Sequence, residues 1–143
     1  MIKADMLVKI ILTIYLLWAS LHDIKKRALP AVGLAVGGVL SLLCIVLNKP
    51  EKEQWIVILL GTIPGIVLYL LAGISAGIGK ADGMVLILTG CICGIKKTLF
   101  LFGLSLIYIF FFAAVVFIIK KNRKSRIPYI PFLLAAYVTA LKI

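Results

Sequence analysis

Asp23 and Asp82 are the two residues whose type and placement most clearly suggest chemistry in this chain. They are two of only five acidic residues among 143, and each stands where a long apolar segment meets a polar loop. An ionisable group at hydrocarbon depth or at its rim is expensive, so it marks a functional site by default. Two carboxyl groups a few ångströms apart share one proton, which lets one act as general base toward a water and the other as general acid. The pair predicts acid/base chemistry if the fold brings the two together.

Position alone leaves a structural role for these carboxylates equally open. Each aspartate could cap a helix or pair with a nearby lysine without taking part in any reaction. A choice between the catalytic and the structural role depends on the helices that carry the two aspartates and on the residues around them.

The composition predicts an integral membrane protein. Hydrophobic residues make up 64% of the chain and the mean hydropathy is +1.21, whereas ordinary soluble domains are roughly 45–50% apolar. The length fits one compact membrane domain over residues 1–143, with no room for a separate soluble domain.

The net charge of +11 does not indicate nucleic-acid binding. The lysines and arginines are spread through short loops between apolar runs, as in the cytoplasmic loops of membrane proteins. The basic run at 120–126 is typical of a topology anchor that contacts anionic lipid. Cys44, Cys91 and Cys93 all lie inside apolar runs, without a zinc-type pair or a disulfide framework, so we expect no metal and no cofactor.

The apolar runs predict an all-α bundle of about six transmembrane helices joined by short loops. The expected segments cover residues 6–21, 31–47, 55–75, 83–95, 98–119 and 128 to the C-terminus. The fourth is short, so it is either a re-entrant segment or a helix that begins within residues 80–82. We favour the second interpretation, because it places the Asp82 carboxylate at the positive end of its own helix dipole.

The distribution of basic residues predicts which side the aspartates face. With the N-terminus outside, nine lysines and arginines fall on inside loops and seven outside. The two densest clusters, 25–27 and 120–126, both fall inside. The positive-inside rule then places both aspartates at the cytoplasmic face.

Glycines at four-residue spacing recur along the expected helices and predict close helix packing in lipid. The pairs are Gly33/Gly37, Gly61/Gly65, Gly73/Gly77 and Gly90/Gly94. Pro64 lies inside the third run and predicts a kink there.

Three motifs accompany the aspartates. Asp23 is followed by Lys25, Lys26 and Arg27 and then by an apolar residue and Pro30, while Asp82 closes the tetrapeptide Gly79-Lys80-Ala81-Asp82. The last segment contains Pro128 and Pro131 around Tyr129 and Ile130, ahead of Phe132. In this order the motifs resemble the type IV prepilin peptidases, intramembrane aspartyl proteases with a Gly-x-Gly-Asp motif.

The resemblance implies an aspartic endopeptidase with Asp23 and Asp82 as its catalytic pair. Its substrates would be prepilins or pilin-like proteins, cut at the cytoplasmic face just before their hydrophobic helix, in a bacterial or archaeal cytoplasmic membrane. Residues that would shape the site or position substrate are Gly79, Lys80, Ala81, Gly83, Arg27, Pro30, Pro128 and Pro131. The chain looks like the short form of the family, without the N-terminal Cys-x-x-Cys domain that goes with methylation.

One departure from the family pattern stands beside the second aspartate. Ala81 replaces the second motif glycine, and a methyl group there can crowd a close backbone approach. Two other functions stay open at this point. A small transporter would use the carboxylates as proton carriers, and a non-catalytic scaffold would bind pilins without cutting them.

Overall fold

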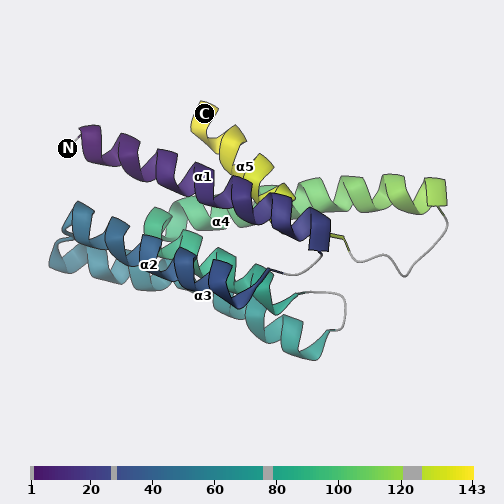
Figure 1. Cartoon of the computed structure of the whole chain (residues 1–143), viewed down its shortest axis with the longest axis horizontal. Coiled ribbons are helices and arrows are strands. Elements are labelled where there is room, and N and C mark those ends of the chain that lie inside the picture. The colour runs from purple at the N-terminus through teal and green to yellow at the C-terminus, as the bar shows by residue number, and fades with distance from the viewer. Residues whose placement is uncertain (1, 27–28, 76–78, 121–126) are drawn as a thin grey trace.

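The computed structural model describes residues 2–26, 29–75, 79–120 and 127–143, with side chains from residue 5 onward. These residues form helices and no strand. The helices are α1 (Ile2–Lys26), α2 (Ala31–Asn48), α3 (Lys52–Ile74), α4 (Lys80–Lys120) and α5 (Ile130–Lys142), arranged as in Figure 1. The all-α prediction is therefore confirmed.

Four helices are long and apolar enough to cross a membrane. The candidate spans are Asp5–Lys26, Ala31–Asn48, Lys52–Ile74 and Lys80–Lys120. The expected sixth span is shorter than predicted, because α5 begins at Ile130 and has 13 residues, below the roughly 17 that a spanning helix needs.

The predicted count of six spans is not confirmed, since α4 occupies the region where two were expected. Within α4, Gly94 has φ 73 and ψ 173, a non-helical conformation, and Figure 1 shows the ribbon turning back beyond this region. The turn comes at a glycine, which reaches positive φ at little cost, and not at the lysine pair 96–97 where we expected the boundary. The start of α4 at Lys80 agrees with a helix that begins within residues 80–82.

Glycines hold α3 and the first part of α4 together at close range. A Cβ built on Gly61 would meet the Gly90 carbonyl oxygen at 2.5 Å, and one built on Gly83 would meet the Tyr69 backbone nitrogen at 2.6 Å. Together with a Gly65 contact to Ile87, these pairs show that the two helices run antiparallel. The predicted packing role is wrong for Gly73, whose surroundings are open, and Gly77 lies outside the described residues. Pro64 lies inside α3, which continues through it.

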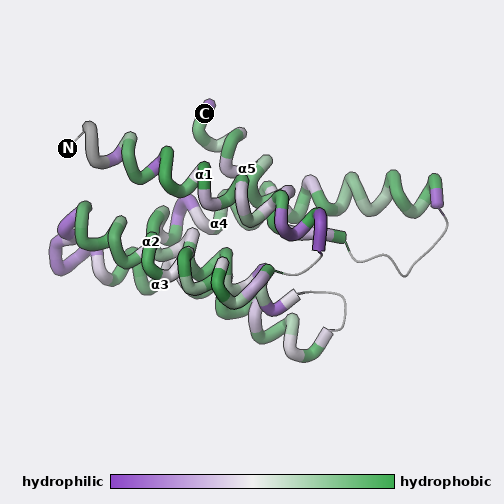
Figure 2. The backbone as a smooth tube through the Cα atoms, in the orientation of Figure 1, coloured by the Kyte–Doolittle hydropathy of each residue, from purple (hydrophilic) through white to green (hydrophobic). Residues whose placement is uncertain are grey.

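The core lies where α1, α4 and α5 meet. Leu16, Leu86, Ile130 and Leu133 are fully buried there. Apolar side chains also cover much of the outer surface, and in Figure 2 the hydrophilic positions gather toward the ends of the helices. This distribution is the one expected of helices that pack on one face and meet lipid on the other.

Candidate active site

Asp23 lies in the last turn of α1 and is 6% exposed. Its Oδ2 accepts a hydrogen bond from the backbone N–H of Ile130, at 3.3 Å. Ile130 is the first residue of α5, so its N–H is one of the donors that a helix leaves without an internal partner. The negative end of the α1 dipole disfavours a carboxylate at this place, and the positive end of α5 offsets that penalty.

Asp82 lies in the first turn of α4 and is 9% exposed. Its Oδ2 accepts a hydrogen bond from the Gly79 N–H at 3.2 Å, and its own N–H donates to the Gly79 carbonyl at 3.1 Å. A Cβ on Gly79 would stand 3.1 Å from this carboxylate oxygen. The first motif glycine therefore leaves room for the carboxylate to fold back onto the start of its own helix.

Tyr129 lies next to the residue that binds Asp23. It precedes Ile130, is 6% exposed, and its hydroxyl lies 3.0 Å from Ser105 Oγ. Burial raises the pKa of the Tyr129 phenol, and the negative charge of Asp82 adds to this effect. The Asp23 carboxylate thus bonds to residue 130, and the charge of the Asp82 carboxylate acts on its neighbour, residue 129.

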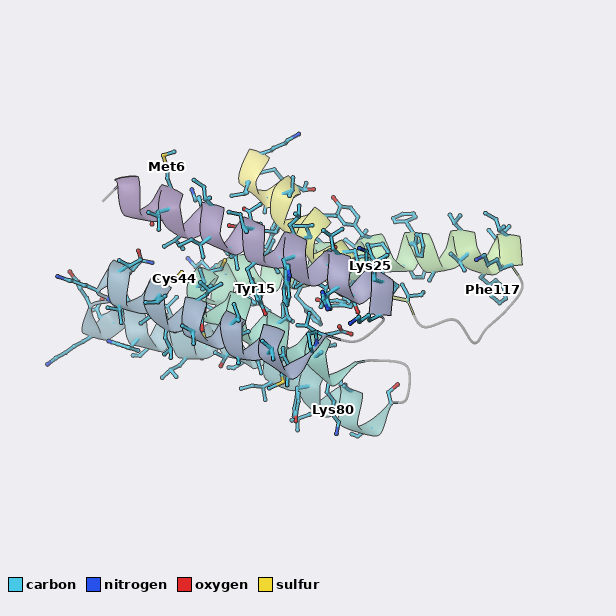
Figure 3. The ribbon with its side chains drawn as sticks, in the orientation of Figure 1. Met6, Tyr15, Lys25, Cys44, Lys80 and Phe117 are labelled. Atoms are coloured by element: carbon cyan, nitrogen blue, oxygen red, sulfur yellow. The ribbon has the colours of Figure 1, made fainter. Side chains whose placement is uncertain are left out.

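The topology also places both aspartates at one end of the bundle. Asp23 closes a helix that runs toward this end, and Asp82 opens one that leaves it. Figure 3 labels Lys25 and Lys80, which mark the two chain segments at this end. The sequence predicted that the aspartates share a membrane boundary, and the order of the helices places both at one end of the bundle.

Comparison with known proteins gave no match to a family model, to a curated protein or to a solved structure. The assignment of a function therefore rests on the residues and their geometry.

The other predicted site residues lie around this centre at different depths. Lys80 is exposed at the start of α4, and the half-buried Ala81 packs against the core. Gly83 is buried against the backbone of α3. Pro30 is the N-cap of α2, and Arg27 lies outside the described residues.

Two prolines flank the residues that meet the aspartates. Pro128 and Pro131 are both half-buried, and Pro131 occupies the first turn of α5, where a proline sacrifices no helical hydrogen bond. They restrict the backbone on either side of Tyr129 and Ile130. Among the predicted site residues, Pro128 and Pro131 therefore lie at the start of α5, where they restrict the backbone on either side of the residue that binds Asp23.

A groove lies between α1 and α2. It holds about 410 Å³ and is lined by apolar and aromatic side chains: Ile11, Ile14, Tyr15, Trp18, Val32, Val36 and Leu40. The Trp18 ring lies 5.0 Å, between centroids, from that of His22, the neighbour of Asp23. The groove thus extends along α1 as far as Trp18, five residues before Asp23.

Sequence reasoning did not assign a role to Tyr129 or to Ser105. Tyr129 stands between the two prolines, and a tyrosine in an apolar stretch needs a partner for its hydroxyl once buried, which is a usable signal. Nothing in the sequence pairs it with Ser105, because that contact depends on how α5 crosses α4. In the described part of the chain, no three His, Cys, Asp or Glu side chains gather in the way metal ligands do.

Proposed function

We propose that this chain is an intramembrane aspartyl endopeptidase in which Asp23 and Asp82 form the catalytic pair. The observation that carries the proposal is that the two buried acids among the described residues lie at one end of the bundle, where α1 ends and α4 begins. The other three acids, Asp5, Glu51 and Glu53, are exposed. A proton-coupled transporter would place such groups nearer the membrane centre.

The reaction follows from two carboxyl groups that hold one proton between them. The ionised carboxylate takes a proton from a water molecule, whose oxygen then bonds to the scissile carbonyl carbon. The protonated carboxyl group stabilises the developing oxyanion and supplies a proton to the amide nitrogen as the C–N bond breaks. The pair again holds one proton, now on the carboxyl group that began ionised; the products are a carboxylic acid and an amine, and no covalent intermediate forms on the enzyme.

The substrate class comes from the motif resemblance and agrees with the surroundings of the site. A prepilin carries its cleavage site just before an apolar helix, and the groove between α1 and α2 offers an apolar surface on the same helix as Asp23. The scissile bond has to leave its helix, because a helical carbonyl is already hydrogen-bonded and shielded. We place the site at the cytoplasmic face, on the strength of the basic clusters.

Leader cleavage of a co-expressed prepilin tests the proposal. Asp23→Asn and Asp82→Asn keep the size of each side chain and abolish its acid/base function, so we expect processing to stop with each variant at normal membrane levels. Glu53→Gln is the matched control, because it removes an exposed acid that lines neither the groove nor the cavity of the bundle. Processing that continues in both site variants would refute the proposal.

A further inference from the structure

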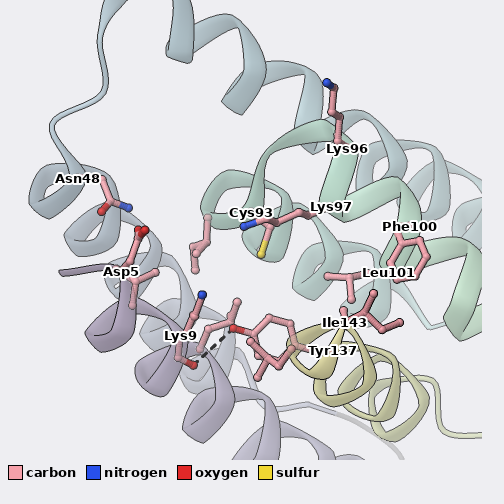
Figure 4. A pocket seen from close by; sticks show the side chains of 15 residues that line it. Asp5, Lys9, Asn48, Cys93, Lys96, Lys97, Phe100, Leu101, Tyr137 and Ile143 are labelled. Atoms are coloured by element: carbon pink, nitrogen blue, oxygen red, sulfur yellow. Dashed lines mark hydrogen bonds between the residues drawn. The ribbon is translucent and has the colours of Figure 1, made fainter. Parts of the chain in front are cut away.

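A second polar cavity lies at the opposite end of the bundle from the aspartates. It holds about 560 Å³, within the roughly 300–1,000 Å³ of small-molecule sites. The N-terminal part of α1, the end of α2, the region of α4 around Gly94 and the C-terminal part of α5 enclose it. Figure 4 shows it from close by.

The side chains around this cavity carry an excess of positive charge. Lys9, Lys96 and Lys97 line it together with a single carboxylate, Asp5. Among the described residues these lysines form no ion pair that would neutralise them. In Figure 4 the amines of Lys9 and Lys97 point into the space between α1 and α4, and the Lys96 amine points away from it. Two unneutralised cations on facing helices favour an anion between them.

The deeper wall of the same cavity is apolar. Leu12 and Leu101 are each 2% exposed, and Ile92 is half-buried beside them. A freely soluble anion gains no binding free energy from an apolar wall. The hydrocarbon part of an amphiphile does gain it, because it removes the wall from water. Asp5 and Asn48 supply acceptor oxygens at the cavity edge, and these suit hydroxyl groups better than a second phosphate.

We propose that this cavity binds the headgroup of an anionic phospholipid that carries hydroxyl groups, as phosphatidylglycerol does. Lys9 and Lys97 hold the phosphodiester from opposite helices. The glycerol hydroxyls donate to Asp5 and Asn48, and the proximal acyl carbons lie over the exposed Phe100 and the half-buried Ile92. The site holds α1, α4 and α5 together at this end. It stands independently of the peptidase proposal, since no residue is shared with the aspartate site.

Lipid titration of the purified protein in detergent tests this site, with bound lipid counted by native mass spectrometry and thermal stability measured in parallel. We expect phosphatidylglycerol to bind and raise the melting temperature, and phosphatidylcholine with the same acyl chains to do neither. Lys9→Gln and Lys97→Gln should each weaken binding about tenfold, because a charge-assisted contact contributes about 1.5 kcal/mol. Lys9→Arg should restore it.

The controls separate this site from general charge attraction and from a small-anion site. Lys52→Gln removes an exposed lysine at the N-terminus of α3 that lines no part of the cavity, and it should leave binding unchanged. Equal weakening by Lys52→Gln, or equal binding of the two lipids, would overturn the proposal. Stabilisation by inorganic phosphate or glycerol phosphate equal to that by the lipid would also overturn it, in favour of a site for soluble anions.

Discussion

The Gly83→Ala substitution offers the sharpest test of how the fold holds Asp82. Gly83 follows the aspartate directly, and an added Cβ would meet the Tyr69 backbone nitrogen at 2.6 Å and its Cα at 2.7 Å. Ordinary contact begins at 3.4 Å, so α3 and α4 have to separate by about 0.8 Å. Backbone atoms cannot rotate aside as a flexible side chain can, so the movement falls on the helices themselves.

Two opposing terms set the expected loss of stability. Overpacking of this kind costs about 1–3 kcal/mol, and alanine returns about 1 kcal/mol over glycine in a helix. The net loss in the free energy of unfolding should be about 1 kcal/mol. The effect on catalysis should be larger, because a displacement of about 1 Å at a reacting group costs about 100-fold in rate.

Gly103→Ala is the matched control, since it makes the same exchange within α4 where no atom lies within 4 Å of the new Cβ. We expect Gly103→Ala to be neutral or slightly stabilising and to process prepilin at the normal rate. Cleavage rate is measured on purified protein with a prepilin substrate, and stability by titration with sodium dodecyl sulfate in mixed micelles. If Gly83→Ala is as stable and as active as Gly103→Ala, the close approach of α3 and α4 does not position Asp82.

Three further predictions address neighbouring features. Tyr129→Phe removes the hydroxyl that bonds to Ser105 and should lower the unfolding free energy by about 1 kcal/mol. A double-mutant cycle with Ser105→Ala should show that the two losses of stability are not additive. Strict additivity would contradict the contact. Ala81→Gly removes a methyl group that packs on the core and should cost up to about 1 kcal/mol without faster cleavage; a gain in rate would show instead that the methyl group restrains an active enzyme. The topology can be tested with single cysteines in a background without native cysteines. Lys25→Cys and Lys80→Cys should react with an impermeant maleimide only from the cytoplasmic side, and Lys52→Cys only from outside. Labelling of all three from one side would refute the topology.

Local chemistry explains which parts of the fold the sequence predicted. The start of α4 followed from the preference of a carboxylate for a helix N-terminus, and Asp82 does lie in the first turn. The first two apolar runs gave helices of the right identity, although α1 extends beyond its apolar stretch to Ile2 and Lys26. Polar residues next to an apolar run can continue its helix when none of them is a helix breaker. A hydropathy profile marks only the apolar part and therefore underestimates the length of the helix.

The failures concern features that depend on tertiary contacts. The lysine pair at 96–97 suggested a loop by charge, yet the backbone departs from helical geometry at Gly94, where only positive φ marks the turn. The length of α5 was overestimated because residues 128 and 129 are apolar enough to extend the run, while the two prolines delay the helix to Ile130. The contact between Asp23 and residue 130 spans 107 positions, and no local pattern encodes it.

The short helix α5 is hydrogen-bonded to α1 at two places, one near each end of the molecule. Its first N–H holds Asp23, and its Tyr137 hydroxyl donates to the Lys9 carbonyl at 3.5 Å, beside the lysine-lined cavity. Because α1 carries both Lys9 and Asp23, the packed pair of helices α1 and α5 connects the cavity to the aspartate end of the bundle. In the proposed peptidase, a displacement of α5 would remove the hydrogen bond that the Ile130 N–H donates to Asp23.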